Sequence, residues 1–518
     1  MTTFAALPID ILLYIFELVS RRPENSLNVA HEPWSLGRVC REWRATLLST
    51  SALWSTVIVT EEAMARGGIT NTDILKEYLA RSQSHALHIG LHETDRPSGA
   101  GSEGEHDPVE DIEPTYEKDK QGQENDTGEI FHAHLLLLLA ECHRWKICEM
   151  LANRPTYIEL SRTTTFDGRN YPLLEEFYLK TSGQSMWAAD IRVHSKVVKR
   201  MMTAPRLRSL DARDAYLLLC PGNNTTITHL GTRVCNFDEI SKLQSYQSLT
   251  ELHIICDWPY RLSPAFKPIT LPNVRKLSSG NSPVLQYLIL PNLTTLTLRE
   301  FERCAPHNLM KFLDHSQCRL DVLSLLSAKL LASVDLTSHH FRSVHRLSVP
   351  MGYPHVLECL SYLEDKETLP NLGIVSIMSN PKTGPVFHTS PNFIQPDLPD
   401  DLEEQGFGEA YTEERLALMA QRDADPKLLR GSTMNFLKKR FRGGGSLKLV
   451  RLCCDVGDLH ALLDAGLREL KSEGLLVMLD QLNSNHDGWM WWRGPYWFTH
   501  DNYLPSLSMK SEEIILPS

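Results

Sequence analysis

The feature of this 518-residue chain that most constrains its fold is an apolar pattern that recurs from Trp145 onward. Each copy has the form apolar-x-x-apolar-x-apolar, and a proline often stands shortly before it. With weaker copies near Ile227, Val274 and Leu285 included, most steps are about 20 to 33 residues, which leaves room for one strand and one return segment per unit. Such a unit cannot bury its apolar face alone, so neighbouring units must stack to form a core. The clearest copies begin at Trp145, Leu174, Leu207, Leu249, Leu293, Leu320, Val344, Leu372 and Leu447.

This repetition predicts an α/β fold in which an irregular solenoid with a parallel sheet occupies residues 130–480. An ordinary α/β domain with several apolar strands is the alternative. Proline-rich sequence interrupts the rhythm over residues 381–446, which indicates an insertion between repeats, with helices expected over residues 412–424 and 434–441. Four tryptophans crowd residues 481–518, where we expect them to cap the last repeat; a ligand stacked on them is the alternative.

Residues 1–60 form a different region, in which apolar residues follow helical spacing. One stripe occupies residues 7–19, where Pro8 suits a first helical turn, and a second occupies residues 35–48. Two or three short helices cannot bury this much aliphatic and aromatic surface among themselves. The surplus must meet either another protein or the following domain, and periodicity alone leaves both outcomes open.

The order of residues in this region resembles the F-box motif: Leu-Pro, acidic-Ile-Leu, Ile-Phe, a gap, Val-Cys-Arg-x-Trp and Leu-Trp. Asp10 stands where glutamate is commonest. The resemblance implies docking onto a Skp-type adaptor and, through it, onto a cullin-RING (SCF-type) ubiquitin ligase. The residues expected to bind the adaptor are Leu7, Pro8, Ile11, Leu12 and Ile15. The residues expected to fill the module's own core are Phe16, Leu36, Val39, Cys40, Trp43, Leu53 and Trp54.

The repeats resemble the leucine-rich repeat, L-x-x-L-x-L-x-x-N/C, but asparagine occupies its final position only at Asn153 and Asn380. Without a regular asparagine ladder the turns must be satisfied in other ways, so we expect a degenerate solenoid. Together the two regions resemble the divergent F-box proteins of mushroom-forming fungi. The resemblance implies a substrate-recognition subunit that is not itself an enzyme and whose repeats bind a target protein. A non-ligase repeat scaffold, whose N-terminal helices merely cap the solenoid, is the alternative function.

Charge is a local feature of this chain. Its net charge is −11, and residues 93–129 carry −10 of it, with thirteen carboxylates against three cations. This stretch follows a connector over residues 61–92 that contains a first strand, and its composition predicts a disordered linker; an acidic interaction tail is the alternative. The remainder is nearly neutral, which argues against nucleic acid as a partner.

The sequence contains few motifs that indicate catalysis, metal binding or targeting. Eleven scattered cysteines without C-x-x-C spacing indicate a reducing compartment, and no export signal or membrane span is recognisable, so we expect a cytoplasmic or nuclear protein. No catalytic motif occurs, and we expect no cofactor or metal. A cluster at His132, His134, Cys142 and His143 fits no common zinc site. Lys438, Lys439, Arg440 and Arg442 form a basic run that is either a nuclear localisation signal or a solvated helix end.

The positions between the repeated apolar residues predict a surface for the target. Early repeats place Glu175, Glu176, Asp211 and Glu251 there, whereas later repeats are basic. We therefore expect the later half to receive an acidic or phosphorylated segment, with an ordinary solvated face as the alternative. The candidate residues are Arg275, Lys276, His345, Arg346, Lys448 and Arg451.

Overall fold

The computed structural model of the chain forms two compact units, Met1–Ala265 and Phe266–Ser518. The structure describes residues 7–20, 26–60, 72–93, 132–152, 154–163, 167–181, 188–216, 226–234, 237–256, 267–280, 282–298, 306–325, 334–351, 363–364, 367–379, 426–443, 446–454 and 466–481.

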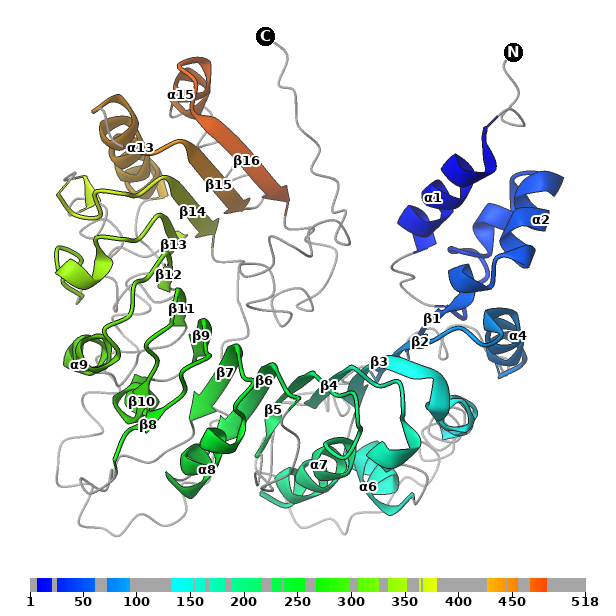
Figure 1. The fold of residues 1–518 in the computed structure, drawn as a ribbon. Helices are drawn as coiled ribbons and strands as arrows, with labels where there is room; N and C mark the ends of the chain where they lie inside the picture. The colour runs from blue at the N-terminus through cyan, green and yellow to red at the C-terminus, as the bar shows by residue number, and fades with distance from the viewer. Residues whose placement is uncertain are drawn as a thin grey trace, which may run out of the picture. The chain divides into compact units, whose positions relative to one another are not determined.

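The first unit contains a parallel sheet whose strands follow one another in chain order (Figure 1). Each strand pairs with the strands before and after it in the sequence, so each repeat contacts its immediate neighbours. The strands described are β1 (Thr56–Thr60), β2 (Leu87–His92), β3 (Trp145–Ala152), β4 (Glu176–Thr181), β5 (Ser209–Tyr216), β6 (His229–Val234) and β7 (Glu251–Cys256).

The second unit repeats this arrangement, again with parallel neighbours in chain order. A separate two-stranded parallel sheet joins β8 (Ile269–Thr270) to β10 (Leu288–Ile289). The main strands described are β9 (Lys276–Ser279), β11 (Thr295–Leu298), β12 (Val322–Leu325), β13 (Arg346–Met351), β14 (Ile374–Ser379), β15 (Leu449–Cys454) and β16 (Leu476–Gln481). A mixed α/β fold with a long parallel sheet is therefore confirmed.

The segments that return the chain between strands are irregular in length and type, as the uneven repeat spacing predicts. Some are helices and others are single 3₁₀ turns, such as η9 (His339–Phe341). None of the described helices has the length and apolar character that crossing a bilayer requires. The longer helices are α6 (Arg154–Arg162), α7 (Ala188–Met201), α9 (Pro306–Ser316) and α13 (Pro426–Arg442), and the shorter ones include α8 (Phe237–Lys242) and α15 (Arg468–Ser472).

The core of each unit is a row of apolar side chains that share one register position. Because side chains alternate across a strand, the middle residue of each apolar pattern points to the same face. Every member of both rows is at most 1 % exposed. The first row comprises Val57, Ile89, Cys148, Phe177, Leu210, Leu230 and Leu252, and the second Leu277, Leu296, Leu323, Leu347, Val375 and Val450.

Side chains just before the strands hydrogen-bond to the backbone carbonyls of the turns, in place of a regular asparagine ladder. Two Leu-Pro-Asn-Leu segments place Asn292 and Asn371 where each side-chain amide donates to the preceding repeat, to the carbonyls of Pro272 (2.8 Å) and Arg342 (2.7 Å). Elsewhere a hydroxyl replaces the amide as the donor to the preceding repeat, as when Thr250 Oγ1 donates to the carbonyl of Thr228. The backbone polar groups at these turns therefore have partners despite the irregular sequence.

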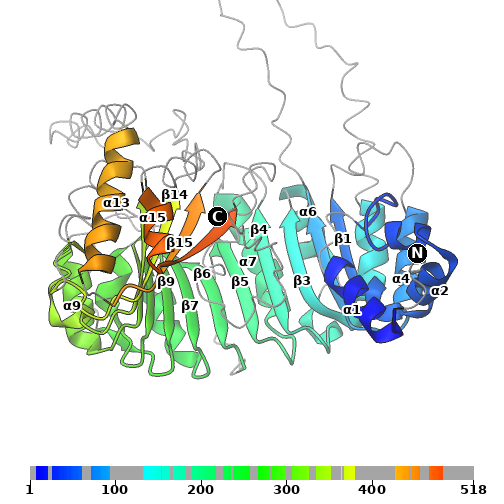
Figure 2. The ribbon, with the colours of Figure 1, turned by 90° about the horizontal axis from the view of Figure 1, so that it is seen from above.

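The N-terminal helices pack directly against the first strand and the helix that follows it (Figure 2). The rings of Trp34 and Tyr78 lie 4.9 Å and 5.1 Å from that of Trp54, and the Arg81 guanidinium lies 4.6 Å from both tryptophan rings. Tyr78 and Arg81 belong to α4, so this cluster crosses the domain boundary predicted at residue 60. The elements joined here are α1 (Ile9–Ser20), η2 (Ser35–Arg38), α2 (Arg41–Ser49), η3 (Ser51–Trp54), β1 and α4 (Thr72–Ser82).

Ser26 closes the open edge of β1. Its backbone N–H donates to the carbonyl of Ile58 (2.8 Å), and its Oγ accepts from the Ile58 N–H (2.8 Å) and donates to the carbonyl of Thr56 (3.2 Å). The indole of Trp34 in turn donates to the Ser26 carbonyl. The polar spacer between the two helical stripes therefore holds the N-terminal region on the sheet.

Several sequence predictions fall outside the described residues. These are the acidic linker beyond residue 93, most of the insertion predicted over residues 381–446, including its expected helix at 412–424, and the tryptophan-rich segment beyond residue 481. The helix expected over residues 434–441 is present within α13.

Candidate functional site

Helix α1 is apolar on two faces. Leu12 and Phe16 point into the module and are 7 % and 0 % exposed. On the other side Ile11 and Tyr14 are 48 % and 56 % exposed, and Ile15, one turn after Ile11, is half-buried. A helix that only covered the sheet would be polar on its outer side.

The exposed apolar side chains are concentrated on this region. Among the described residues, eight of the ten large hydrophobic side chains that are exposed lie between Leu7 and Leu48. Leu136 and Leu476 are the other two. We call the following side chains the exposed apolar set: Leu7, Ile9, Ile11, Tyr14, Val19, Val29, Val39 and Leu48.

The residues expected to bind an adaptor divide into two groups. Leu7, Pro8 and Ile11 are exposed, and Ile15 is half-buried. Leu12 instead packs inside the module, because it lies on the same face of α1 as Phe16.

The expected core is largely present, with one correction. Phe16, Leu36, Leu53 and Trp54 are buried, and Cys40 and Trp43 are half-buried. Val39 is 58 % exposed, so its placement in the core was wrong. The reason is local: Leu36 takes the inward position on η2, and the extended backbone at Cys40 ends that turn directly after Val39.

The module is preformed by internal contacts. The Cys40 sulfur accepts from the Trp43 N–H (3.4 Å) at the start of α2, and the Phe16 ring meets the Trp43 ring edge-on with centroids 5.0 Å apart. The Trp54 indole donates to the Leu47 carbonyl (3.0 Å). The outer side chains of α1 are therefore displayed from a fixed frame, which lowers the entropic cost of binding.

The basic residues of the later repeats do not form one patch. Arg275, His345 and Lys448 are exposed just before their strands, and Lys276, Arg346 and Arg451 are half-buried on the strands. Lys276 and Arg346 share one register row, but three strand spacings separate them, or about 14 Å. The basic residues are therefore distributed along the sheet rather than gathered on one strand.

Sequence reasoning missed a row of hydroxyls on the same strands. In five successive copies the residue between the second and third apolar positions is serine or threonine, which is the signal that the sequence offers. All five are buried, and within the described part of the chain the Oγ atoms of Ser324 and Ser348 have no hydrogen-bond partner. The row comprises Ser278, Thr297, Ser324, Ser348 and Ser376.

The acidic residues of the early repeats are engaged with neighbouring side chains. His253 Nε2 lies 3.0 Å from Glu251 Oε1, and His229 Nε2 lies 3.6 Å from Glu251 Oε2. Gly231 leaves room for the Asp211 carboxylate, which a Cβ at this glycine would meet at 2.4 Å. Asp211 and Glu251 are buried, so they do not form the open acidic surface that the sequence suggested.

The basic residues of α13 also form hydrogen bonds and ion pairs within the protein. Arg440 is buried and donates to the backbone carbonyls of Leu363 and Thr368, while Lys439 pairs with Glu364. Arg442 pairs with Glu469 (2.6 Å) and Glu473, and these hydrogen bonds raise the pKa of its guanidinium. The run therefore fastens α13 to its neighbours, which argues against an accessible localisation signal.

The histidine and cysteine cluster has no metal-binding arrangement. His134 is buried, and Cys142 Sγ contacts the Asn170 carbonyl (3.8 Å). Burial raises the pKa of the Cys142 thiol, which disfavours the thiolate that zinc would need. Within the described ranges no three His, Cys, Asp or Glu side chains are placed to hold a metal ion.

Comparisons with known proteins identify no family for the chain. No model of a protein family matches it, and no curated protein matches it either. Among solved structures, a Bacteroides fragilis protein determined by the Northeast Structural Genomics Consortium is 12 % identical, with a TM-score of 0.30. The likeness covers 49 % of this chain and 78 % of that one. Any functional assignment therefore rests on the chain's own residues.

Proposed function

We propose that the chain is an F-box substrate-recognition subunit of a cullin-RING (SCF-type) ubiquitin ligase. In this proposal the N-terminal helices bind a Skp-type adaptor, the repeats bind a target protein, and the chain contributes no catalytic step. The observation that carries the proposal is the exposed apolar set, which is concentrated on a module whose order of residues resembles the F-box.

The physical argument is the cost of leaving this surface in water. Apolar side chains contribute roughly 25 cal/mol for each Å² removed from water, so a partner groove that covered Leu7, Ile11 and Tyr14 would gain binding free energy. Anchors on one face of a rigid amphipathic helix suit a groove on the partner.

A second function has its own support. Ser26 and the aromatic cluster around Trp54 hold the N-terminal region against β1, which is what a solenoid cap does. A repeat scaffold without a ligase partner would use the same contacts. The exposed apolar set separates the two functions, because a cap has no need for apolar residues on its outer side.

Target binding would then use the strand face of the later repeats. Because the basic residues are spread over several strands, we propose an extended acidic segment as the occupant rather than a single phosphate. Charge reversal at Arg275, Arg346 and Arg451 is expected to reduce capture of the target, and undiminished capture at low salt would reject this surface.

The decisive experiment measures binding of the full chain to a purified Skp-type adaptor by calorimetry. Replacing Leu7, Pro8 and Ile11 together with alanine is expected to weaken binding at least about 100-fold, because these exposed residues are the proposed anchors. Leu136→Ala is the matched control, since this leucine is exposed but lies outside the module. Adaptor binding that is absent in the wild type, or unchanged in the triple variant, would reject the F-box function and favour the cap.

A further inference from the structure

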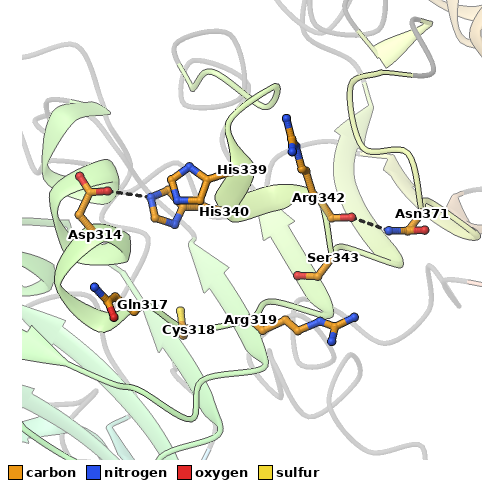
Figure 3. A pocket seen from close by; sticks show the side chains of 9 residues that line it. All are labelled: Asp314, Gln317, Cys318, Arg319, His339, His340, Arg342, Ser343 and Asn371. Atoms are coloured by element: carbon orange, nitrogen blue, oxygen red, sulfur yellow. Dashed lines mark hydrogen bonds and ion pairs between the residues drawn. The ribbon is translucent and has the colours of Figure 1, made fainter.

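A cavity of about 570 Å³ lies in the second unit, where successive repeats lead into β12, β13 and β14. Its walls come from the end of α9, from η9 and from the turn before β14. Figure 3 shows His339 and His340 side by side, with Asp314 on one side of them and Arg319 and Arg342 on the other.

The lining of this cavity carries two arginines and one carboxylate, so its charge is positive. Arg319 and Arg342 are exposed, and neither guanidinium forms an ion pair with another described residue. The carboxylate of Asp314 is the acidic group of the lining, and it already accepts a contact from His340 Nε2 at 2.8 Å. The two arginines are therefore available for an anion from solution.

Two other polar side chains of the lining, those of Ser343 and Asn371, are already hydrogen-bonded within the protein. Ser343 Oγ donates to the Leu320 carbonyl (2.6 Å), and the Asn371 amide donates to the Arg342 carbonyl (2.7 Å). Burial raises the pKa of the Cys318 thiol to about 11, so the thiol stays protonated. It therefore lines the cavity without acting as a nucleophile. These features favour a binding site over a reactive one.

The size of the cavity argues for an organic ligand. A volume of 570 Å³ falls in the range of pockets that enclose small molecules, and it far exceeds the space that a single inorganic ion fills. The exposed ring of His339, with its centroid 3.9 Å from that of His340, offers a flat surface beside the arginines.

We propose that this cavity binds a small organic anion whose phosphate or carboxylate groups pair with Arg319 and Arg342. The ligand class follows from the volume of the cavity and from two guanidiniums that form no ion pair with any described residue. The site is independent of adaptor docking, because all of its residues belong to the second unit.

The test uses the full chain and calorimetry at low ionic strength. The probes are AMP and ribose 5-phosphate for the phosphate arm, citrate for the carboxylate arm, and adenosine as the neutral match of AMP. At least one anion is expected to bind, and Arg319→Ala combined with Arg342→Ala is expected to weaken that binding at least tenfold. Arg468→Ala is the matched control, because Arg468 is an exposed arginine of the same unit that does not line the cavity and is not part of the proposed target surface.

Three outcomes would overturn the proposal. They are the absence of binding by every anion, equal binding of adenosine and AMP with no binding of ribose 5-phosphate or citrate, and unchanged affinity in the double variant. Thermal melts of both variants establish that the fold is kept, which is expected because the two side chains are exposed.

Discussion

The N-terminal module and the repeats handle apolar side chains in opposite ways. In the repeats the residues of the apolar pattern are buried in register rows, and the strand faces carry hydroxyls and charged groups. In the module, α1 buries Leu12 and Phe16 while also displaying Ile11 and Tyr14. Stacked repeats can bury each other's exposed apolar surface, whereas a single small module cannot bury all of its own. The module therefore keeps exposed apolar surface after it has packed against β1 and α4.

The strongest test of this contrast removes the centre of the module. Trp54→Ala is expected to cost about 3–5 kcal/mol, because the indole is fully buried and contacts Trp34, Tyr78 and Arg81. Hydrogen exchange resolved by residue should show α1 and α2 opening before the strands of the second unit. Uniform loss of protection along the whole chain would mean that module and repeats unfold as one body.

The next largest effect concerns the closed edge of β1. Ser26→Ala leaves the buried N–H of Ile58 without its acceptor, which is expected to cost about 1–3 kcal/mol. Ser55→Ala is the control, because that hydroxyl makes a local bond on the surface. Faster exchange at the Ile58 amide in the first variant alone is the predicted result, and equal effects in both would contradict the edge role.

Two serines of the second unit, Ser324 in the hydroxyl row and Ser343 outside it, are expected to change stability in opposite directions when replaced with alanine. Ser324→Ala removes a buried hydroxyl that has no partner in the described part of the chain, so stability is expected to rise by about 1 kcal/mol. Ser343→Ala deletes a donor to the Leu320 carbonyl and is expected to lower stability by about 1 kcal/mol. Urea titration measures both changes. Destabilisation by Ser324→Ala would show that this hydroxyl has a stabilising role after all.

The smallest effect is expected on the outer side of α1. Ile11→Ala and Tyr14→Ala should each change stability by less than about 0.5 kcal/mol, because both side chains are exposed. Leu12→Ala on the inner side should cost about 2–5 kcal/mol. A melt in which all three variants fall together would show that the outer face is packed and would remove the basis for partner docking.

The regular parts of the fold were predictable because they depend on local periodicity. The spacing of Leu320, Leu323 and Leu325 defines a strand and its buried face without knowledge of its neighbours. Most of what the sequence does not show concerns side chains whose partners are distant in the sequence. Nothing local shows that Arg440 reaches the carbonyl of Leu363, or that Ser26 reaches Ile58. Val39 was misplaced because helical spacing was assumed to continue through the turn at Cys40.

The candidate site was only partly predictable, because local periodicity does not show which side of α1 faces the module. The sequence marked the apolar residues of α1, but it could not say that Leu12 packs inward while Tyr14 points outward. The Arg319 and Arg342 cavity has no sequence motif, because its lining comes from three successive return segments. Only the stacking of repeats brings those segments together.

The position of Ser26 has a consequence for self-association. The first strand of a parallel array presents a row of unpaired N–H and C=O groups, and such edges are templates for fibre growth when another chain adds to them. At β1 the groups of Ile58 that point outward are already occupied by one serine. A second molecule could extend the sheet here only after displacing the segment that Trp34 holds in place. The outer edge of β1 is therefore blocked at Ile58 by a serine from what reads, in the sequence, as a spacer.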